Sequence, residues 1–121
     1  MLYKTFGAEF SAILERNGYS CAGVGGKIKV PCNRISDIVR NRRGVTAETS
    51  FLLGRLFDVH AGYFIMRYTA YISLQDMQER FDAGLVTQAE LSETQTALGL
   101  DQPSHLLYDQ LNAPVECKSA A

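Results

Sequence analysis

This chain of 121 residues lacks the segments that direct proteins into or across membranes. It has no uninterrupted run of about 18 apolar residues, the length at which a membrane-spanning helix is suspected. Its N-terminus, residues 1–5, lacks the apolar core of a signal peptide. We therefore expect no membrane partner and a cytoplasmic location.

Metal-binding, disulfide and catalytic patterns are also missing. The three cysteines, Cys21, Cys32 and Cys117, are an odd number with no C-x-x-C spacing, and the two histidines, His60 and His105, form no H-x-x-x-H pair. This pattern predicts free thiols in a reducing compartment, no zinc site and no cofactor. No Ser/His/Asp or Cys/His pairing is supported, so we do not expect an enzyme.

Neither sign of charge dominates the chain, because its formal net charge is −1. The charges are nevertheless unevenly placed. Residues 1–72 carry ten Lys or Arg and five Asp or Glu, whereas residues 73–121 carry two and eight. The first part is therefore +5 and the second −6. This division predicts a basic half that meets an anion and an acidic half with another role, with chance as the alternative.

What is present is enough apolar sequence for one helical core. Hydrophobic residues make up 46% of the chain, which is ordinary for one globular domain. Apolar spacing and capping signals, among them Ser20, Thr46 and a Thr87/Glu90 capping box, predict an all-α fold. The expected helices span residues 7–16, 21–28, 31–41, 46–57, 61–73, 74–83, 87–98 and 105–111, with a frayed tail over 112–121.

The second of these helices is weak by composition. Gly23, Gly25 and Gly26 interrupt it, and each costs about 1 kcal/mol relative to alanine in a helix interior. Close packing is a reason for a glycine at position 25, but the sequence offers no such reason at 23 or 26. The spacing matches neither of the common phosphate-binding glycine motifs.

The helix expected over 61–73 is apolar around most of its circumference, which indicates burial on more than one side. We expect the second side to meet another subunit in a homodimer, with cover by the C-terminal extension as the alternative. The residues assigned to this interface are Tyr63, Phe64, Met66, Arg67, Tyr68 and Tyr71.

The stretch from Val30 to Thr46 carries the most specific pattern in the chain. Ile35, Ile38 and Val39 share one helical face, and polar residues occupy the opposite face. Three arginines follow at the helix end. Arginine and asparagine can each make two hydrogen bonds to one base, and arginines also hold phosphates. The pattern predicts a helix that reads a DNA groove; the alternative is a solvated helix whose cations complement its dipole.

Two short helices joined by a tight turn, 20–28 and 31–41, have helix-turn-helix spacing. From Gly18 to Leu74 the chain resembles the Xre/Cro-type helix-turn-helix family, and within it the HigA-type (VapI-like) antitoxins and regulators. The resemblance rests on Gly18-Tyr19-Ser20, Asn33-Arg34-Ile35-Ser36, Arg42-Arg43-Gly44-Val45-Thr46-Ala47-Glu48-Thr49, Leu56-Phe57 and Ala70-Tyr71.

The resemblance implies a five-helix, lambda-repressor-like DNA-binding domain, which we expect over residues 1–73. Composition and spacing add an acidic helical extension (74–111), longer than the family's core needs, and a flexible tail (112–121). It also implies a homodimer that binds a palindromic operator in its own promoter and silences a small basic toxin. A stand-alone phage or plasmid regulator stays open as an alternative. So does a protein-interaction module whose acidic half binds a basic partner with little DNA binding.

By position, the resemblance makes the helix at 31–41 the recognition helix. Asn33 suits adenine and Arg34 suits guanine, and we expect Asp37 to pair with Arg34 and Arg40. The residues that would face the bases are Cys32, Asn33, Arg34, Ser36, Asp37 and Arg40. Those that would contact phosphates are Ser20, Lys27, Lys29, Arg42 and Arg43.

Overall fold

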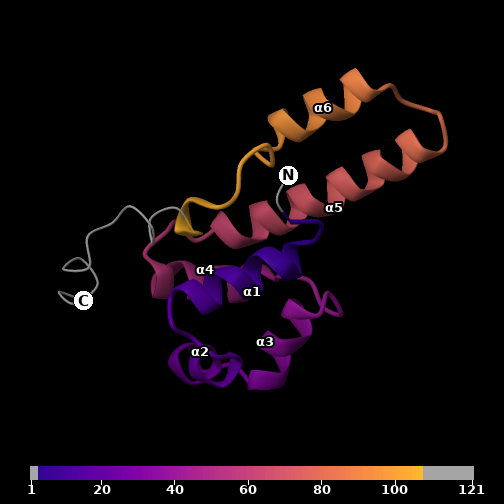
Figure 1. The fold of residues 1–121 in the computed structure, drawn as a ribbon. Coiled ribbons are helices and arrows are strands. Elements are labelled where there is room, and N and C mark those ends of the chain that lie inside the picture. The colour runs from indigo at the N-terminus through magenta and orange to yellow at the C-terminus, as the bar shows by residue number, and fades with distance from the viewer. Residues whose placement is uncertain (1–2, 108–121) are drawn as a thin grey trace.

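The computed structural model describes residues 3–107, and every regular element in that range is a helix (Figure 1). The helices are α1 (Phe6–Arg16), α2 (Cys21–Ile28), α3 (Cys32–Val39), α4 (Ala47–Phe57), α5 (Tyr63–Asp82) and α6 (Gln88–Ala97). The predicted all-α fold is confirmed for these residues. None of these helices is long and apolar enough to cross a membrane. The predicted tail, Cys117 and most of the helix expected over 105–111 lie outside the described residues.

Side-chain caps fix where four of the helices begin, and three of these caps were predicted from the sequence. The Ser20 hydroxyl oxygen accepts a hydrogen bond from the Gly23 N–H at 3.0 Å, which starts α2. Thr46 caps α4 in the same way, and Thr87 forms a reciprocal capping box at the start of α6. Each cap satisfies a backbone N–H that the helix itself leaves unpaired. The predicted starts of these helices are therefore confirmed.

The core lies along α1, where aromatic rings from α1 and α5 meet. Phe10 and Phe64 are fully buried with ring centroids 5.8 Å apart, and Phe6 stacks on Phe10 at 5.6 Å. Ile35 and Ile38 add the apolar face of α3 to the same core. Burial of such side chains is the main force that holds α3 against the rest of the molecule.

The α2–α3 pair depends on one close backbone approach. A Cβ at Gly25 would lie 2.5 Å from the carbonyl oxygen of Val30, so only glycine fits there. Lys29 adopts the left-handed conformation that ends α2, with φ 62°, and Pro31 precedes α3. The close-packing role expected for Gly25 is confirmed, whereas nothing lies within 4 Å of a Cβ at Gly26.

The far end of α3 is clamped onto the start of α1. Asn41 takes the left-handed conformation with φ 61°, and the Arg42 N–H donates to the Asp37 carbonyl oxygen at 2.8 Å, as in a Schellman motif. The Asn41 side chain accepts from the Gly7 N–H at 3.0 Å and donates to the Thr5 hydroxyl oxygen at 3.1 Å. These bonds fix the direction in which the chain leaves α3.

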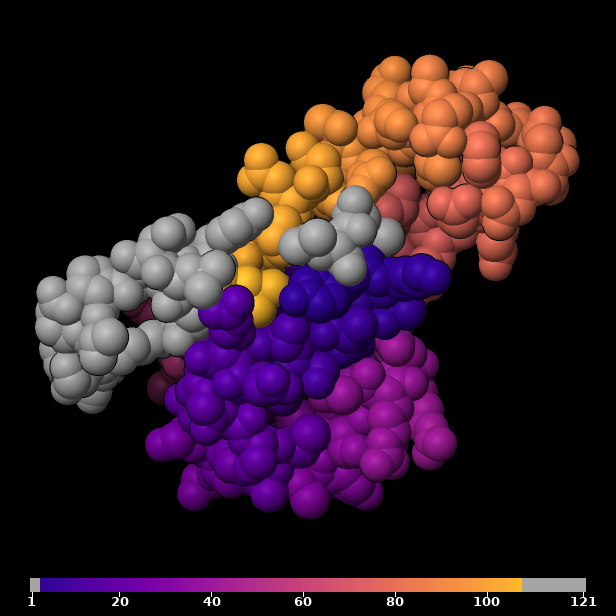
Figure 2. Space-filling model, in the orientation of Figure 1, coloured from indigo at the N-terminus to yellow at the C-terminus, as the bar shows by residue number. Residues whose placement is uncertain are grey.

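The predicted break after Ser73 is wrong, because α5 runs without interruption from Tyr63 to Asp82. No glycine or proline occurs within this span, and the buried Leu74 continues the apolar stripe across the expected boundary. The turn comes instead at Gly84, where φ is 78°. The second half of α5 and α6 form a hairpin that extends beyond the core (Figures 1 and 2).

The assignment of α5 residues to a dimer interface is wrong for Phe64 and Tyr71, which are used inside the chain. Phe64 and Tyr71 are buried inside the chain, at 0% and 1% exposure. Tyr68 is half-buried with its ring edge-on to Phe6. Met66 is exposed, at 64%. The intramolecular alternative explains why these aromatic residues are there.

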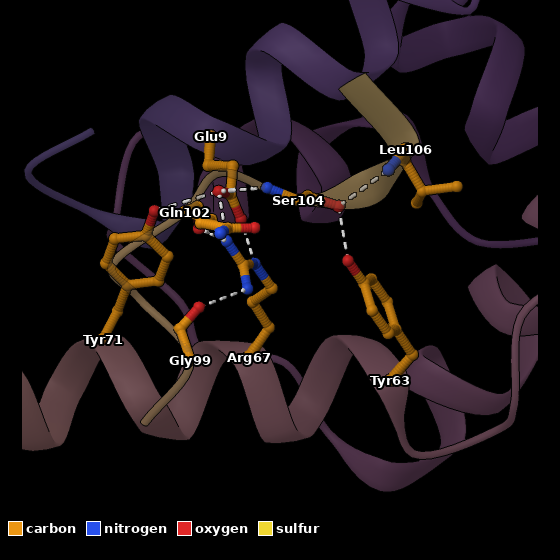
Figure 3. A network of polar contacts seen from close by, with 8 residues as sticks. All are labelled: Glu9, Tyr63, Arg67, Tyr71, Gly99, Gln102, Ser104 and Leu106. Carbon is orange, nitrogen blue, oxygen red and sulfur yellow. Dashed lines mark hydrogen bonds and ion pairs between the residues drawn. The ribbon is translucent and has the colours of Figure 1, made fainter. Parts of the chain in front are cut away.

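The remaining two assigned residues, Tyr63 and Arg67, are held by the segment that follows α6 (Figure 3). The Tyr63 hydroxyl is hydrogen-bonded to the Ser104 hydroxyl. Arg67 donates to the carbonyl oxygens of Gly99 and Gln102, at 3.3 and 3.0 Å. The C-terminal extension therefore covers this side of α5, as the alternative interpretation stated.

Candidate nucleic-acid interface

Helix α3 has one buried and one accessible face, as its sequence predicted. Ile35 and Ile38 are buried at 0% and 1% exposure, which fixes the rotation of the helix about its axis. Among the six residues expected to face bases, three are exposed: Cys32, Asn33 and Arg40. The other three, Arg34, Ser36 and Asp37, are half-buried at the edge of the same face.

The predicted ion pairing of Asp37 is wrong. Among residues 3–107, Asp37 makes no ion pair with Arg34 or Arg40. An ion pair between solvent-accessible side chains contributes little free energy, so an ion pair between Asp37 and either arginine is not required for stability. Both guanidinium groups are therefore free of intramolecular carboxylates in this part of the chain.

Cations flank α3 at both ends. Before it, the exposed Lys27 and Lys29 line a cavity of about 380 Å³ together with Arg55 from α4. After it, the exposed Arg42 and Arg43 line a second cavity of about 180 Å³ beside α5. A helix of eight residues is about 12 Å long, so the two groups bracket a short accessible face.

Ser20 caps α2 and also has a hydroxyl proton that can be donated to a ligand. Its hydroxyl oxygen accepts from the Gly23 N–H, which leaves the hydroxyl proton free to donate, and the residue is exposed. It stands at the N-terminus of α2, where the helix dipole favours a negative group. A phosphate contact from this position is therefore chemically reasonable, in line with the sequence expectation.

Arg55 is a cation near this surface that the sequence reasoning missed. Its guanidinium lies 5.6 Å from the centroid of the exposed Phe51 ring, a cation–π contact that holds it on the outer side of α4. A basic residue in the last turn of α4 was the only local signal. Its proximity to Lys27 and Lys29 follows from the packing of α2 on α4, which no short motif encodes.

The strongest electrostatic coupling lies elsewhere, on α1 and α5 (Figure 3). Glu9 is completely buried and accepts from Arg67 Nε at 2.5 Å, Arg67 Nη2 at 2.7 Å, the Tyr71 hydroxyl at 3.1 Å and the Ser104 N–H at 3.1 Å. Burial raises the pKa of Tyr71, and the charge and hydrogen bond of Glu9 add to this effect. Burial lowers the pKa of Arg67, but its contacts with Glu9 outweigh this and the net pKa is raised.

The geometry of this cluster around Glu9 indicates a role in stabilising the fold. Every oxygen of Glu9 is satisfied by donors from the same chain, and within residues 3–107 no buried side-chain polar atom lacks a partner. The described part of the chain also contains no group of three or more His, Cys, Asp or Glu residues that could hold a metal ion. Cys21 and Cys32 are free thiols.

Comparisons with known proteins add no relative. No protein-family model, no curated protein and no solved structure matches the chain. The arguments that follow rest on the residues and their arrangement.

Proposed function

We propose that this protein is a sequence-specific DNA-binding repressor, with α2 and α3 as a helix-turn-helix unit in a lambda-repressor-like domain. One observation carries the proposal. The accessible face of α3 is polar, its opposite face is locked into the core by Ile35 and Ile38, and cations flank it at both ends. A helix with these properties fits the DNA major groove, which is about 12 Å wide.

The residues divide into two groups by chemistry. Asn33 and Arg34, in the first turn of α3, have the side chains that read adenine and guanine edges with paired hydrogen bonds. The second group contacts phosphates and so sets the position of α3 on the DNA without reading its sequence. Its members are Ser20, Lys27, Lys29, Arg42 and Arg43.

The proposal includes a homodimer on a palindromic operator in the protein's own promoter. In helix-turn-helix dimers the two recognition helices enter successive major grooves about 34 Å apart. Most of the α5 residues first assigned to the dimer interface make contacts inside the chain. Of that set, Met66 is the exposed residue that can contact a second subunit. The further role as a HigA-like antitoxin rests on the sequence resemblance over Gly18–Leu74.

A second candidate function is binding of a basic protein by the hairpin of α5 and α6. Acidic side chains are exposed along it, and its Arg80 is already paired with Asp76 at 3.1 Å. Leu85 at the turn is 71% exposed, the kind of apolar anchor that a protein partner covers. Such a partner fits an antitoxin, and it also fits an interaction module without DNA binding. The exposed acids are Asp76, Glu79, Asp82, Glu90 and Glu93.

The test is binding of the purified protein to the DNA upstream of its own gene, measured by fluorescence anisotropy at two salt concentrations. We expect saturable binding by a dimer and a steep loss of affinity with salt, because released counterions drive phosphate binding. The Asn33→Ala/Arg34→Ala variant should lose at least about tenfold in affinity, since each paired base contact contributes about 1–3 kcal/mol. Arg80→Ala, which removes a cation from the hairpin, should bind normally.

Binding no tighter than to random DNA of equal length would refute the proposal. The second candidate is tested separately with the product of an adjacent reading frame that encodes a small basic protein. A complex that survives Asn33→Ala/Arg34→Ala but is lost on neutralising Glu79 and Asp82 would establish the hairpin as the partner surface. Loss of both activities in one correctly folded variant would contradict this division of roles.

A further inference from the structure

The smaller of the two cavities beside α3 has an unusual lining. It has a volume of about 180 Å³ and lies between the loop after α3 and the side of α5. Arg42 and Arg43 come from the loop, and Tyr68 and Gln75 come from α5. None of the residues that line it is acidic. The cavity therefore gathers positive charge and hydrogen-bond donors with no carboxylate to neutralise them.

The donors that line this cavity have hydrogen-bonding capacity that the described part of the chain does not use. Among residues 3–107, Arg42 and Arg43 make no ion pair, and the Tyr68 hydroxyl makes no hydrogen bond. Gln75 uses its amide nitrogen once, in a long bond of 3.4 Å to the Lys4 carbonyl oxygen, so its second proton is free. Two arginines, a tyrosine hydroxyl and a glutamine amide that line one cavity suit an anion with several acceptor oxygens.

The cavity is also built on a fixed backbone. Asn41 is held by Gly7 and Thr5, which sets the course of the loop that carries both arginines. A Cβ at Gly44 would lie 2.5 Å from the Tyr68 hydroxyl oxygen. A larger residue at position 44 would therefore displace that hydroxyl. The backbone that carries both arginines and the position of the Tyr68 hydroxyl are therefore set before any ligand arrives, which lowers the entropy cost of binding.

Size restricts the ligand. Pockets for drug-sized molecules begin at about 300 Å³, and this cavity is smaller. A tetrahedral oxyanion fits such a volume and presents acceptor oxygens to donors on different walls. Guanidinium groups match phosphate oxygens in particular, because they can donate two parallel hydrogen bonds.

We propose that this cavity binds a single phosphate group, with Arg42 and Arg43 supplying charge and Tyr68 and Gln75 supplying orienting hydrogen bonds. The phosphate has two sources, the DNA backbone or a free phosphate-bearing molecule. Only the first source rests on the proposed DNA-binding function. In that case α5 takes part in DNA binding through Tyr68 and Gln75, two residues that the sequence pattern did not assign to it.

The first experiment uses inorganic phosphate and the full chain without DNA. Backbone amide shifts in ¹H–¹⁵N NMR spectra are followed during a phosphate titration, with chloride at matched ionic strength as the reference. We expect saturable shifts centred on Gly44 and the neighbouring arginines. Tyr68→Phe, which keeps the ring against Phe6, should weaken binding about tenfold, the lower end of the effect of one hydrogen bond to a charged group.

Two further variants sharpen this titration. The Arg42→Gln/Arg43→Gln variant should abolish saturation, because it removes both charges. Arg80→Gln, which removes a cation from the distant hairpin, should titrate like the unmodified chain. Thermal unfolding of each variant in chloride verifies that a loss of phosphate binding is not a loss of fold.

The second experiment replaces single phosphates of the bound DNA with neutral methylphosphonates. If the DNA backbone fills the cavity, neutralising one position in each half-site should weaken binding to the unmodified chain, and should weaken binding to Tyr68→Phe less, because that variant has already lost one hydrogen bond to the same phosphate. Phosphate titration without DNA binding would support the free-ligand source and refute the DNA function alone. DNA binding that is indifferent to Tyr68→Phe, together with no saturation by phosphate, would overturn the phosphate site and leave the DNA function standing.

Discussion

Replacement of Gly26 by alanine should stabilise this protein, whereas the same replacement at Gly25 should destabilise it. The two positions are neighbours in α2 and share its helical conformation. They differ in what a new methyl group would meet. At Gly26 nothing lies within 4 Å of the added Cβ, whereas at Gly25 it would lie 2.5 Å from the Val30 carbonyl oxygen and 3.3 Å from backbone atoms of Cys32.

The magnitudes follow from two opposing effects. Alanine is favoured over glycine in a helix interior by about 0.5–1 kcal/mol, and Gly26→Ala should gain this in full. At Gly25 the same gain is outweighed by overpacking, which costs about 1–3 kcal/mol and here falls at the upper end because the obstructing atoms belong to the backbone. We therefore expect a net loss of about 1–2 kcal/mol for Gly25→Ala.

The measurement is thermal and urea unfolding of the two variants and the unmodified chain, followed by far-UV circular dichroism. For a domain of this size the melting temperature should rise by about 2–5 °C for Gly26→Ala and fall by about 5 °C or more for Gly25→Ala. Under the proposed function, Gly25→Ala should also weaken DNA binding, because it pushes α3 away from α2. Equal melting temperatures for the two variants would refute the close approach of α2 to the turn before α3.

Three further predictions concern other parts of the fold. Arg67→Met should cost about 3–5 kcal/mol in urea unfolding, because it leaves the buried Glu9 carboxylate without its cation, and adding Glu9→Gln should recover part of this loss; a lower stability for the double variant would contradict the role of Arg67. Since the pKa of Tyr71 is raised above its unfolded value of about 10, its contribution to stability is complete below that pH and is lost as the pH rises further, so Tyr71→Phe should flatten the fall in melting temperature above about pH 10, and an unchanged slope would count against this. Ser20→Ala should cost about 1 kcal/mol in the same unfolding assay through loss of the α2 cap, and no loss would mean that the cap is dispensable.

Local signals made much of the fold predictable from the sequence. Ser20, Thr46 and Thr87 mark helix starts because their side chains satisfy backbone groups within the next three residues. The spacing of Ile35 and Ile38 gives the buried face of α3 in the same way. Information of this kind lies within one helical turn, so a single sequence is enough to read it.

The parts that the sequence did not reveal depend on contacts between distant residues. Glu9 occupies the apolar stripe of α1, yet nothing near it in sequence indicates that Arg67, Tyr71 and Ser104 will surround it. The same holds for the phosphate-sized cavity, where Arg43 meets Gln75 only because α5 passes beside the loop after α3. The helix break expected after Ser73 was wrong for a related reason. The apolar stripe of α5 packs against different parts of the chain along its length, and such a change of neighbours does not require the helix to end.

The burial of Glu9 also changes how the uneven charge of the chain is understood. A carboxylate at 0% exposure is tolerated only if its oxygens are fully hydrogen-bonded, and one of its four bonds comes from the Ser104 N–H, in the acidic second part of the chain. The segment around Ser104 is therefore part of the same folded unit as α1 and not an independent attachment. It follows that the basic and acidic halves are two surfaces of one folded unit, joined by α5, which carries residues of both.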